Sequence, residues 1–533
     1  MTPRVRPMGE RAFLLEVASL DEALALHAAL AATRPDGVVD LVPGARTVLV
    51  RVDPSTLALP AARAWARGAV EGAVPGAAAS GPVVELEIAY DGADLTETAA
   101  LLGMSAEELT RRHAAAQWRV AFTGFAPGFG YLVSDDWPFD LPRLETPRTR
   151  VAAGSVGLAG VFTGAYPRDT PGGWRLIGTT GAPLFDADAA SPALLVPGAR
   201  VRFLPVAAST PSALAGSSAP GDPETPGTGT PGDPQPPGDP QTPGRGIRIL
   251  EPGLLTTVQD LGRAGAGAVG VAVSGALDRG ALRTANRLLG NAEGAAGLEV
   301  TMGGLRAVAE RDLWVAVTGA WGVVRLDGRE IDPYEAHAWP AGAELHLDWF
   351  TRGARGYVAV RGGVDARPVL GSRSTDLLAG LGPAALHAGD ALGVRDDAPA
   401  PIPVAPPAAW GAPHDDELEL ELAPGPRADW FGPEAHETLF DTVWTVSNHA
   451  DRVGARLDGP ALARVREGEL ASEGMVPGAL QVPPSGRPTI LLADGPVTGG
   501  YPVIAVVTDA SLDLVAQARP GTRIRFRHAR AAV

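Results

Sequence analysis

The sequence predicts a mainly β protein that begins with a small α+β domain. Short apolar runs between glycine, proline and aspartate residues dominate the 533-residue chain, and stretches with helical periodicity are few. One long stretch holds almost no large apolar residues, so it cannot bury a core. The chain is therefore expected to form several β-rich domains on either side of an extended linker.

Residues 1–82 are expected to form the α+β domain. Strand-like runs at 12–17 and 47–52 alternate with Ala/Leu-rich helical stretches at 20–32 and 57–70. Strands and helices that alternate within so short a span are typical of a small α+β sandwich.

Residues 83–205 are expected to form a β-barrel or sandwich with helices near its start. A strand opens the segment and a helix is predicted at 95–102. Ser105 and Glu108 have the spacing of a capping box, which predicts another helix that ends near His113. Beyond this point the sequence is typical of short strands between Gly/Pro turns.

The linker spans residues 206–246, where Pro-Gly-Asp-Pro-Gln units repeat. An Ala/Pro-rich dip at 397–413 divides the second half into domains 247–396 and 414–533. A helix is predicted at 278–289, and Gly290 marks its end. Short β-like runs in this half are expected at 313–318, 357–361, 418–422, 489–492, 503–507 and 523–526. The run at 418–422 alternates acidic residues with leucine, which predicts a strand with one solvated face.

The composition excludes several kinds of chemistry. The chain has no cysteine and no lysine, so all 45 basic residues are arginine. This excludes a cysteine nucleophile, a disulfide framework, a Walker-type phosphate loop, a Schiff-base lysine and a biotin attached to this chain. The nine histidines lack metal-ligand spacing, so no metal site is expected. Any anion must be bound by arginine, backbone N–H groups or helix N-termini.

Charge and hydropathy limit the kinds of partner that the chain is expected to bind. The formal net charge is −16, which argues against a nucleic-acid partner. No apolar run reaches the roughly 18–20 residues that span a bilayer, and the N-terminus has no apolar signal core. We expect a soluble cytoplasmic protein that binds no membrane.

The most informative segment is a rigid turn at 124–132 that carries three aromatic residues. Arg148 and Arg150 follow this turn in the sequence. A rigid aromatic turn beside guanidinium groups can bind a small, flat, anionic ligand. The alternative is a packed hairpin with its aromatic side chains in the core. The candidate binding residues of this region are Phe125, Pro127, Gly128, Phe129, Arg148, Arg150, Gly154 and Ser155.

The second half carries further polar constellations. Gln259 and Asp260 precede Arg263, and Ser274 and Asp278 fall at a predicted helix N-terminus, where the dipole favours an anion. Asp278 could instead be only the N-cap. The other candidates are Arg361, Arg373 and the turn Thr498, Gly499, Gly500 and Tyr501. For each of them, the alternative is that the residues only form a turn and that the arginines lie on the surface.

Long ordered motifs place the chain near two known families. The first half resembles the B-type subunits of bacterial 5-oxoprolinase, also described as kinase-inhibitor or allophanate-hydrolase-subunit-1-like proteins. The matching residues are His113 and the segments 124–132, 142–157, 163–167 and 171–178. The second half resembles the C-type subunits, which are allophanate-hydrolase-subunit-2-like. The matching segments are 252–263, 274–278, 285–291, 361–363, 369–375, 451–454, 472–474 and 498–502.

The resemblance implies a fold and an activity. It implies cyclophilin-like β-barrels, one in 83–205 and two in 247–533, and halves that pair across a shared groove within one chain or between chains. The activity would be ATP-dependent opening of 5-oxo-L-proline to L-glutamate, with ATP and Mg and a separate LamB/YcsF-type subunit. Arginine clusters suit both the substrate carboxylate and the phosphates.

Hypothetical roles follow for individual residues. Without cysteine and lysine, the proton carriers must be Asp, Glu, His or Tyr. The catalytic candidates are His113, Tyr131, Asp260, Asp278 and Tyr501. The family match adds Arg452 to the candidates for substrate or ATP binding.

One motif departs from the family, and two other functions remain open. The family usually reads Asp-Arg-Gln-Thr-Thr-Gly-Gly-Tyr-Pro, but Gly495, Pro496 and Val497 here lack the Arg and the Gln. If that Arg binds an anion, substrate or activity is altered. The first alternative is a biotin-dependent carboxyltransferase that acts on urea or a similar amide, with its biotin carrier on another chain. The second is a non-catalytic regulator of a histidine kinase.

Overall fold

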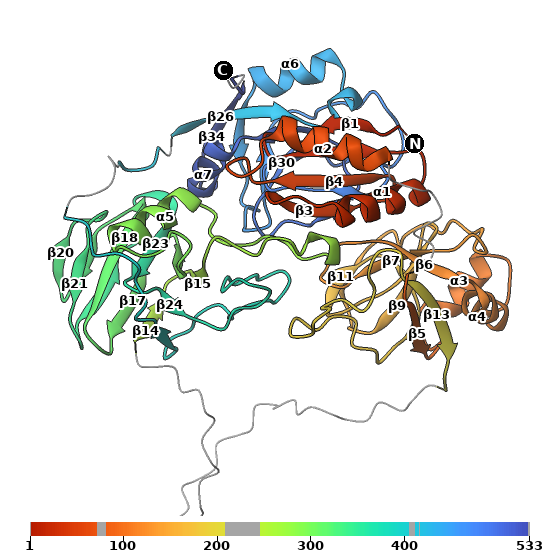
Figure 1. Cartoon of the computed structure of the whole chain (residues 1–533), viewed down its shortest axis with the longest axis horizontal. Helices are drawn as coiled ribbons and strands as arrows, with labels where there is room; N and C mark the ends of the chain where they lie inside the picture. The colour runs from red at the N-terminus through yellow and green to blue at the C-terminus, as the bar shows by residue number, and fades with distance from the viewer. Residues whose placement is uncertain (1, 72–80, 208–245, 405–410, 415, 531–533) are drawn as a thin grey trace, which may run out of the picture.

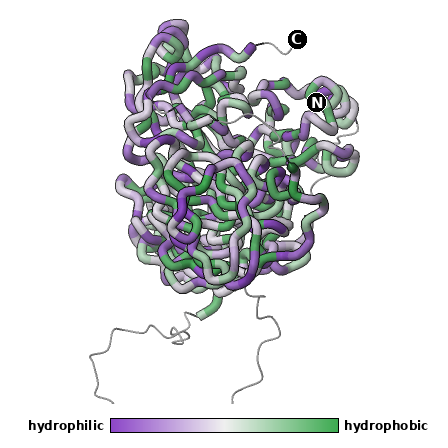
Figure 2. Tube along the Cα trace, turned by 90° about the vertical axis from the view of Figure 1, so that its left-hand side faces the viewer, coloured by the Kyte–Doolittle hydropathy of each residue, from purple (hydrophilic) through white to green (hydrophobic). Residues whose placement is uncertain are grey.

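A computed structural model describes residues 2–71, 81–207, 246–404, 411–414 and 416–530 of the chain. These residues form four packed units that are rich in β-structure (Figure 1). Short apolar and polar stretches alternate along the chain (Figure 2), as expected where strands bury one face. The expected linker at 206–246 lies almost entirely outside the described residues, and the dip at 397–413 lies partly outside them.

The first unit is the expected α+β domain. Its antiparallel sheet has the order β1-β2-β4-β3, and two helices cover one face through a core that includes Phe13, Leu26 and Val50. The elements are β1 (Arg4–Pro7), β2 (Ala12–Glu16), α1 (Leu20–Ala32), β3 (Val38–Pro43), β4 (Thr47–Val52) and α2 (Leu59–Glu71).

The second unit is a nearly closed barrel with the strand order β12-β9-β10-β7-β6-β13-β5. A bridge between Ala89 and Thr179 joins its two edges. Ser105 accepts a hydrogen bond from the backbone N–H of Glu108, which confirms the predicted helix start. The elements are β5 (Val83–Ile88), α3 (Leu95–Leu101), α4 (Ala106–Ala115), β6 (Trp118–Thr123), β7 (Gly130–Val133), β8 (Arg148–Val151), β9 (Ser155–Ala159), β10 (Phe162–Ala165), β11 (Thr170–Gly172), β12 (Arg175–Thr179) and β13 (Arg200–Pro205).

The third unit packs two sheets around one core rather than forming a single closed barrel. Their orders are β20-β19-β22-β17-β14-β25-β24 and β15-β16-β23-β18-β21. The elements are β14 (Ile247–Pro252), β15 (Leu255–Gln259), η2 (Gly267–Val269), α5 (Arg279–Leu288), β16 (Gly297–Thr301), β17 (Leu305–Ala309), β18 (Leu313–Trp321), β19 (Val324–Leu326), β20 (Arg329–Ile331), β21 (His337–Trp339), β22 (Glu344–Leu347), β23 (Arg352–Val360), β24 (Val364–Asp365) and β25 (Ala391–Val394).

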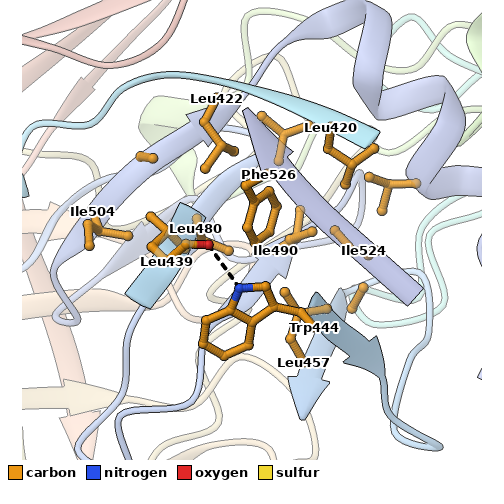
Figure 3. Close-up of a cluster of buried hydrophobic side chains, with 14 of the residues drawn as sticks. Leu420, Leu422, Leu439, Trp444, Leu457, Leu480, Ile490, Ile504, Ile524 and Phe526 are labelled. Carbon is orange, nitrogen blue, oxygen red and sulfur yellow. Dashed lines mark hydrogen bonds between the residues drawn. The ribbon is translucent and has the colours of Figure 1, made fainter. Parts of the chain in front are cut away.

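The fourth unit is a closed barrel with the order β26-β33-β30-β31-β28-β27-β34. In its core the Trp444 indole N–H donates to the Leu439 carbonyl at 3.0 Å, beside Phe526 (Figure 3). Helices α6 and α7 were not expected from the sequence. The elements are β26 (Glu417–Pro424), η3 (Ala428–Trp430), α6 (Pro433–Asp441), β27 (Val443–Val446), β28 (Gly454–Asp458), β29 (Glu473–Gly474), β30 (Ala479–Gln481), β31 (Thr489–Leu491), β32 (Thr498–Gly499), β33 (Val503–Val507), α7 (Asp509–Gln517) and β34 (Arg523–His528).

The two ends of the chain pack against each other. The α+β domain lies on the C-terminal barrel at the top of Figure 1, where red and blue segments meet. Leu14 and Leu49 share one apolar cluster with Met475 and Val503. An ion pair of 2.7 Å between Arg427 and Glu16 borders this cluster. The two halves are therefore in contact within a single chain.

Neither a bilayer-spanning helix nor a metal cluster occurs among the described residues. No described helix has the length and apolar character that crossing a bilayer requires. In the described part of the chain, no group of three or more His, Asp or Glu side chains is placed to hold a metal ion.

Candidate functional site

A narrow pocket of about 70 Å³ opens where the first barrel meets the second half of the chain. A volume of this size holds a few water-sized atoms, so it suits a small ring rather than a nucleotide. Loops from both halves form its wall. The lining residues are Phe125–Pro127, Thr170, Pro171, Gly270, Ala272, Asp376, Leu378, Ala379 and 494–497.

The loop between β6 and β7 is docked onto the second half of the chain. A Cβ atom on Gly124 would lie 1.7 Å from the Oγ1 atom of Thr498, so only glycine fits there. The backbone N–H of Gly128 donates to the Val269 carbonyl at 3.0 Å. Phe125 has a φ of 67°, a left-handed conformation that a non-glycine residue adopts only when its surroundings hold it.

The aromatic residues of this turn divide into two groups. Phe129 is buried against Trp174, with ring centroids 5.3 Å apart, and Tyr131 packs on the same cluster. Burial raises the pKa of Tyr131 to about 12, so it keeps its proton at neutral pH. Phe125 is 40% exposed and lines the pocket. The alternative of a packed hairpin therefore applies to Phe129 and Tyr131, whereas Phe125 remains available to a ligand.

Asp376 places a carboxyl group with unused hydrogen-bonding capacity in the pocket wall. Its side chain is 1% exposed, and its Oδ1 atom accepts a hydrogen bond of 2.8 Å from the Ala379 N–H. Its Oδ2 atom has no hydrogen-bond partner among the described residues and lies 3.9 Å from Arg263 Nη1. Burial, and then the charge of Asp494, raises the pKa of Asp376 to about 6. A carboxyl that titrates near neutral pH in a pocket is typical of an acid–base group.

A buried ion network holds the opposite wall. Arg452 donates to Asp494 at 2.8 Å, pairs with Glu299 and donates to the Gly275 carbonyl at 2.6 Å. The Ser274 hydroxyl donates to Asp494 Oδ1 at 2.7 Å. Burial opposes ionisation of Glu299, but the nearby guanidinium groups outweigh it and lower the pKa of Glu299. The network fixes the loop that presents residues 494–497 to the pocket.

Asp260 organises the loop that carries Asp376. Its Oδ1 atom accepts hydrogen bonds of 2.6 Å from the hydroxyls of both Ser372 and Ser374, and its Oδ2 atom accepts one of 2.6 Å from the Arg373 N–H. Gln259 donates to the Thr375 carbonyl at 3.0 Å on the same loop. Asp260 is thus occupied with positioning rather than free to accept a proton.

Asp278 caps α5. Its Oδ1 atom accepts a hydrogen bond of 2.8 Å from the Ala281 N–H, and its Oδ2 atom accepts one of 2.7 Å from Gln517. Burial, and then the charge of Asp513, raises the pKa of Asp278 to about 7. The N-cap interpretation is confirmed, and Asp278 does not line the pocket.

Other sequence candidates lie away from the pocket. His113 is fully buried in the first barrel, where its ring nitrogens contact Tyr90 at 2.8 Å and Thr163 at 2.9 Å. Burial lowers the pKa of His113 to about 3, so the ring stays neutral. Arg148 and Arg150 are paired with Asp94 and Asp169. Also outside the pocket lining are Gly154, Ser155, Arg361, Arg373, Gly499, Gly500 and Tyr501.

The sequence alone did not single out Asp376. Its one local signal is an acidic residue directly after the polar loop 371–375. Residues 495–497, where the chain departs from the family motif, line the pocket itself. The departure therefore changes the wall that a substrate would contact.

Similar proteins agree with this two-part construction. The family model "Carboxyltransferase domain, subdomain A and B" matches residues 269–528, and "Carboxyltransferase domain, subdomain C and D" matches residues 3–195. The C-type subunit of 5-oxoprolinase from Escherichia coli K12 is 38% identical over 287 residues, which cover 52% of this chain and 90% of that protein. The chain belongs to the carboxyltransferase-domain family. It is a fusion of a half like the B-type subunits of 5-oxoprolinase and a half like the C-type subunits.

Further relatives match between a third and nearly all of the chain. The B-type subunit of 5-oxoprolinase from Escherichia coli O157:H7 is 41% identical over 177 residues, which cover 32% of this chain and 78% of that protein. Urea amidolyase of Saccharomyces cerevisiae is 33% identical over 304 residues, 52% of this chain but 16% of that protein. The crystal structure of TTHA0988 has a TM-score of 0.81 and 38% identity, and the match covers 97% of this chain and 99% of that one.

Proposed function

We propose that this chain is the combined B–C component of an ATP-dependent 5-oxoprolinase, which opens 5-oxo-L-proline to L-glutamate together with a separate LamB/YcsF-type subunit. The observation that carries the proposal is the pocket, which needs both halves of the chain. Relatives of each half are named as components of 5-oxoprolinase. A reaction site shared by the two halves explains why this chain would keep them together.

The pocket offers complementary groups to a small lactam. Phe125 and Pro127 supply an apolar wall for the flat ring. Arg168 lies beside the loop that carries Leu378 and Ala379, because a Cβ atom on Gly380 would lie 2.9 Å from its Nη1 atom. That Nη1 atom is buried and has no hydrogen-bond partner among the described residues. Arg168 lies behind the pocket wall rather than in its lining, and we assign its guanidinium to the substrate carboxylate.

Asp376 is the candidate acid–base group of the reaction. Its free Oδ2 atom can accept a proton from the water that attacks the ring carbonyl, and the protonated carboxyl can return the proton to the leaving nitrogen. The γ-phosphoryl group of ATP would pass to the amide oxygen with release of ADP, which would make the carbonyl carbon a better target for water. Departure of the ring nitrogen would then leave an acyl phosphate, and a second water would release inorganic phosphate and glutamate. Mg²⁺ would enter with the phosphates, since Mg²⁺ commonly binds substrate phosphates and few protein carboxylates.

The pocket itself does not fit ATP. Its volume of about 70 Å³ is too small for a nucleotide. The nucleotide must therefore bind at a neighbouring cavity of this chain or on the partner subunit.

The test is a reconstitution with omissions. The purified chain is mixed with a purified LamB/YcsF-type subunit, 5-oxo-L-proline, Mg²⁺ and ATP, and glutamate and ADP are measured. We expect glutamate only when both proteins and ATP are present. Asp376→Asn should abolish it, whereas Asp458→Asn, a change at an exposed site, should not. No glutamate from the wild-type chain with a demonstrably active partner would overturn the proposal.

The departure at residues 495–497 favours carboxyl transfer as a second candidate function. A neutral amide such as urea needs no guanidinium at Gly495, and urea amidolyase matches 52% of the chain. The carboxyl group would come from carboxybiotin on another chain, because this chain has no lysine. Transfer of labelled carboxylate from a carboxylated biotin carrier to urea, without ATP, would support this candidate against the first.

A further inference from the structure

A second and larger cavity lies on the other side of the pocket wall. Its volume is about 670 Å³, within the range of small-molecule sites. The α+β domain, the start of α5 and the C-terminal barrel all line it. Ser274 lines this cavity, and its hydroxyl group donates to Asp494 of the pocket wall. The two sites are thus separated by one hydrogen-bonded layer.

Four arginines, Arg11, Arg51, Arg279 and Arg283, line this cavity. Among the described residues, the guanidinium of Arg279 has no hydrogen-bond or ion-pair partner, and its Nε atom is buried. Burial, followed by the charges of the other three arginines, lowers the pKa of Arg279 to about 10. Arg11, Arg51 and Arg283 each have a carboxylate within ion-pair distance, so Arg279 is the cavity arginine that has none among the described residues. An unpaired and partly desolvated guanidinium is costly unless an anion completes it.

The acidic residues that line the cavity, Glu10, Asp53, Asp509 and Asp513, already accept hydrogen bonds or form ion pairs. Asp513 accepts hydrogen bonds from the backbone N–H groups of Arg279 at 3.0 Å and Gly280 at 3.2 Å. Asp509 pairs with Arg11, and Asp53 accepts a hydrogen bond of 2.7 Å from a serine hydroxyl. The guanidinium of Arg283 instead has a carboxylate oxygen of Glu293 at 3.6 Å.

The remaining wall is apolar. Leu261, Leu277, Val476 and Pro477 contribute hydrophobic surface next to the arginines. Guanidinium groups bind phosphate through paired N–H donors, and an apolar wall suits a planar base. This combination fits a phosphorylated nucleoside better than a small inorganic anion.

We propose that this cavity binds a nucleoside triphosphate, with Arg279 and Arg283 holding its phosphates. The choice of a nucleoside triphosphate rests on the proposed function, whereas the anion site rests on the arginines alone. The site lies within one layer of the pocket, so a bound nucleotide would sit near the lactam without occupying its place.

Binding to the full-length chain tests the proposal without any turnover assay. Isothermal titration calorimetry is performed with ATP, inorganic triphosphate and adenosine, at fixed salt concentration. The variants are Arg279→Gln and Arg283→Gln, and the matched control is Arg487→Gln on the surface, where the side chain is 63% exposed. Thermal melting of each variant checks that it is folded.

We expect ATP to bind the wild type and the control equally, and to bind each cavity variant at least about tenfold more weakly. A tenfold loss of affinity corresponds to about 1.4 kcal/mol, which the loss of one charge-assisted hydrogen bond to a phosphate is enough to cause. Inorganic triphosphate should compete with ATP for the site. The affinity for adenosine should be the same in the variants as in the wild type. No ATP binding by the wild type, or equal binding by the folded cavity variants, would overturn the proposal. ATP binding without glutamate formation would instead refute the proposed function alone.

Discussion

Replacing Arg452 by glutamine removes the cation that holds two buried carboxylates beside the pocket. The Arg452 side chain is 4% exposed, and those of Glu299 and Asp494 are each 1% exposed. Glutamine retains part of the volume and can still donate a hydrogen bond, so the change tests the charge rather than the packing. Both carboxylates would lose their only guanidinium partner at hydrogen-bond distance among the described residues.

The expected loss of folding free energy is large because the three side chains are buried away from water. Removing one partner of a buried ion pair costs about 3–5 kcal/mol, since the remaining charge stays uncompensated. For a unit of about 150–250 residues, each kcal/mol lowers the melting temperature by about 2–4 °C. We therefore expect Arg452→Gln to lower the melting temperature of the second half by roughly 6–20 °C.

Differential scanning calorimetry at pH 7 measures this effect, with Arg487→Gln as the control. Arg487 forms an exposed ion pair of 3.5 Å with Asp458, which is worth about 0–1 kcal/mol. Adding Glu299→Gln to Arg452→Gln should restore part of the loss, because one stranded charge disappears. A melting temperature of Arg452→Gln that stays as close to the wild type as the control would refute the reasoning.

Three further predictions concern the pocket and the first barrel. Gly124→Ala should lower the kcat/KM for glutamate formation by about 100-fold, because the new Cβ atom clashes with Thr498 and displaces the pocket loop. The control is Gly68→Ala, which has free space around it. Equal rates for the two variants would count against the docked loop. Asp376→Asn should lower kcat by about 100-fold or more while raising the melting temperature at pH 8. The folded-state pKa of Asp376 is raised to about 6, so the wild type loses stability as pH rises from about 4 to 6, and the two proteins should converge below pH 4. The pKa of His113 is lowered to about 3, so the folded protein should show no NMR titration of this ring above pH 5. As the pH falls, His113 takes up a proton in the unfolded protein before it does so in the folded protein, so the stability should fall below about pH 6.5. A titration midpoint near 6.5 in the folded protein would contradict this.

Local patterns in the sequence predicted much of the fold. The alternation of acidic residues and leucine marked β26, because a strand places successive side chains on opposite faces. The capping pair Ser105 and Glu108 marked the start of α4. Helices α6 and α7 were missed because neither begins with a capping side chain nor ends at a glycine, the signals that marked α4 and α5.

The site was less accessible to sequence reasoning than the fold. Phe125 and Pro127 could be selected because a Gly/Pro turn with aromatic residues is a local signal. Asp376 could not be, since its pKa depends on burial and on Asp494, which lies far away in the sequence. The cavity arginines are likewise distributed over distant segments, so only the folded chain brings Arg279 near Arg11.

The most direct test of the central claim is ATP-dependent glutamate formation from 5-oxo-L-proline by this chain with a LamB/YcsF-type subunit. Wild type, Asp376→Asn and Gly68→Ala are compared in the same assay, with omission of ATP and of each protein. We predict that the wild type and Gly68→Ala form glutamate only in the complete mixture, and that Asp376→Asn forms almost none. Glutamate formation by Asp376→Asn at the wild-type rate would contradict the assignment of the pocket, and no glutamate from the wild type with an active partner would contradict the proposed function.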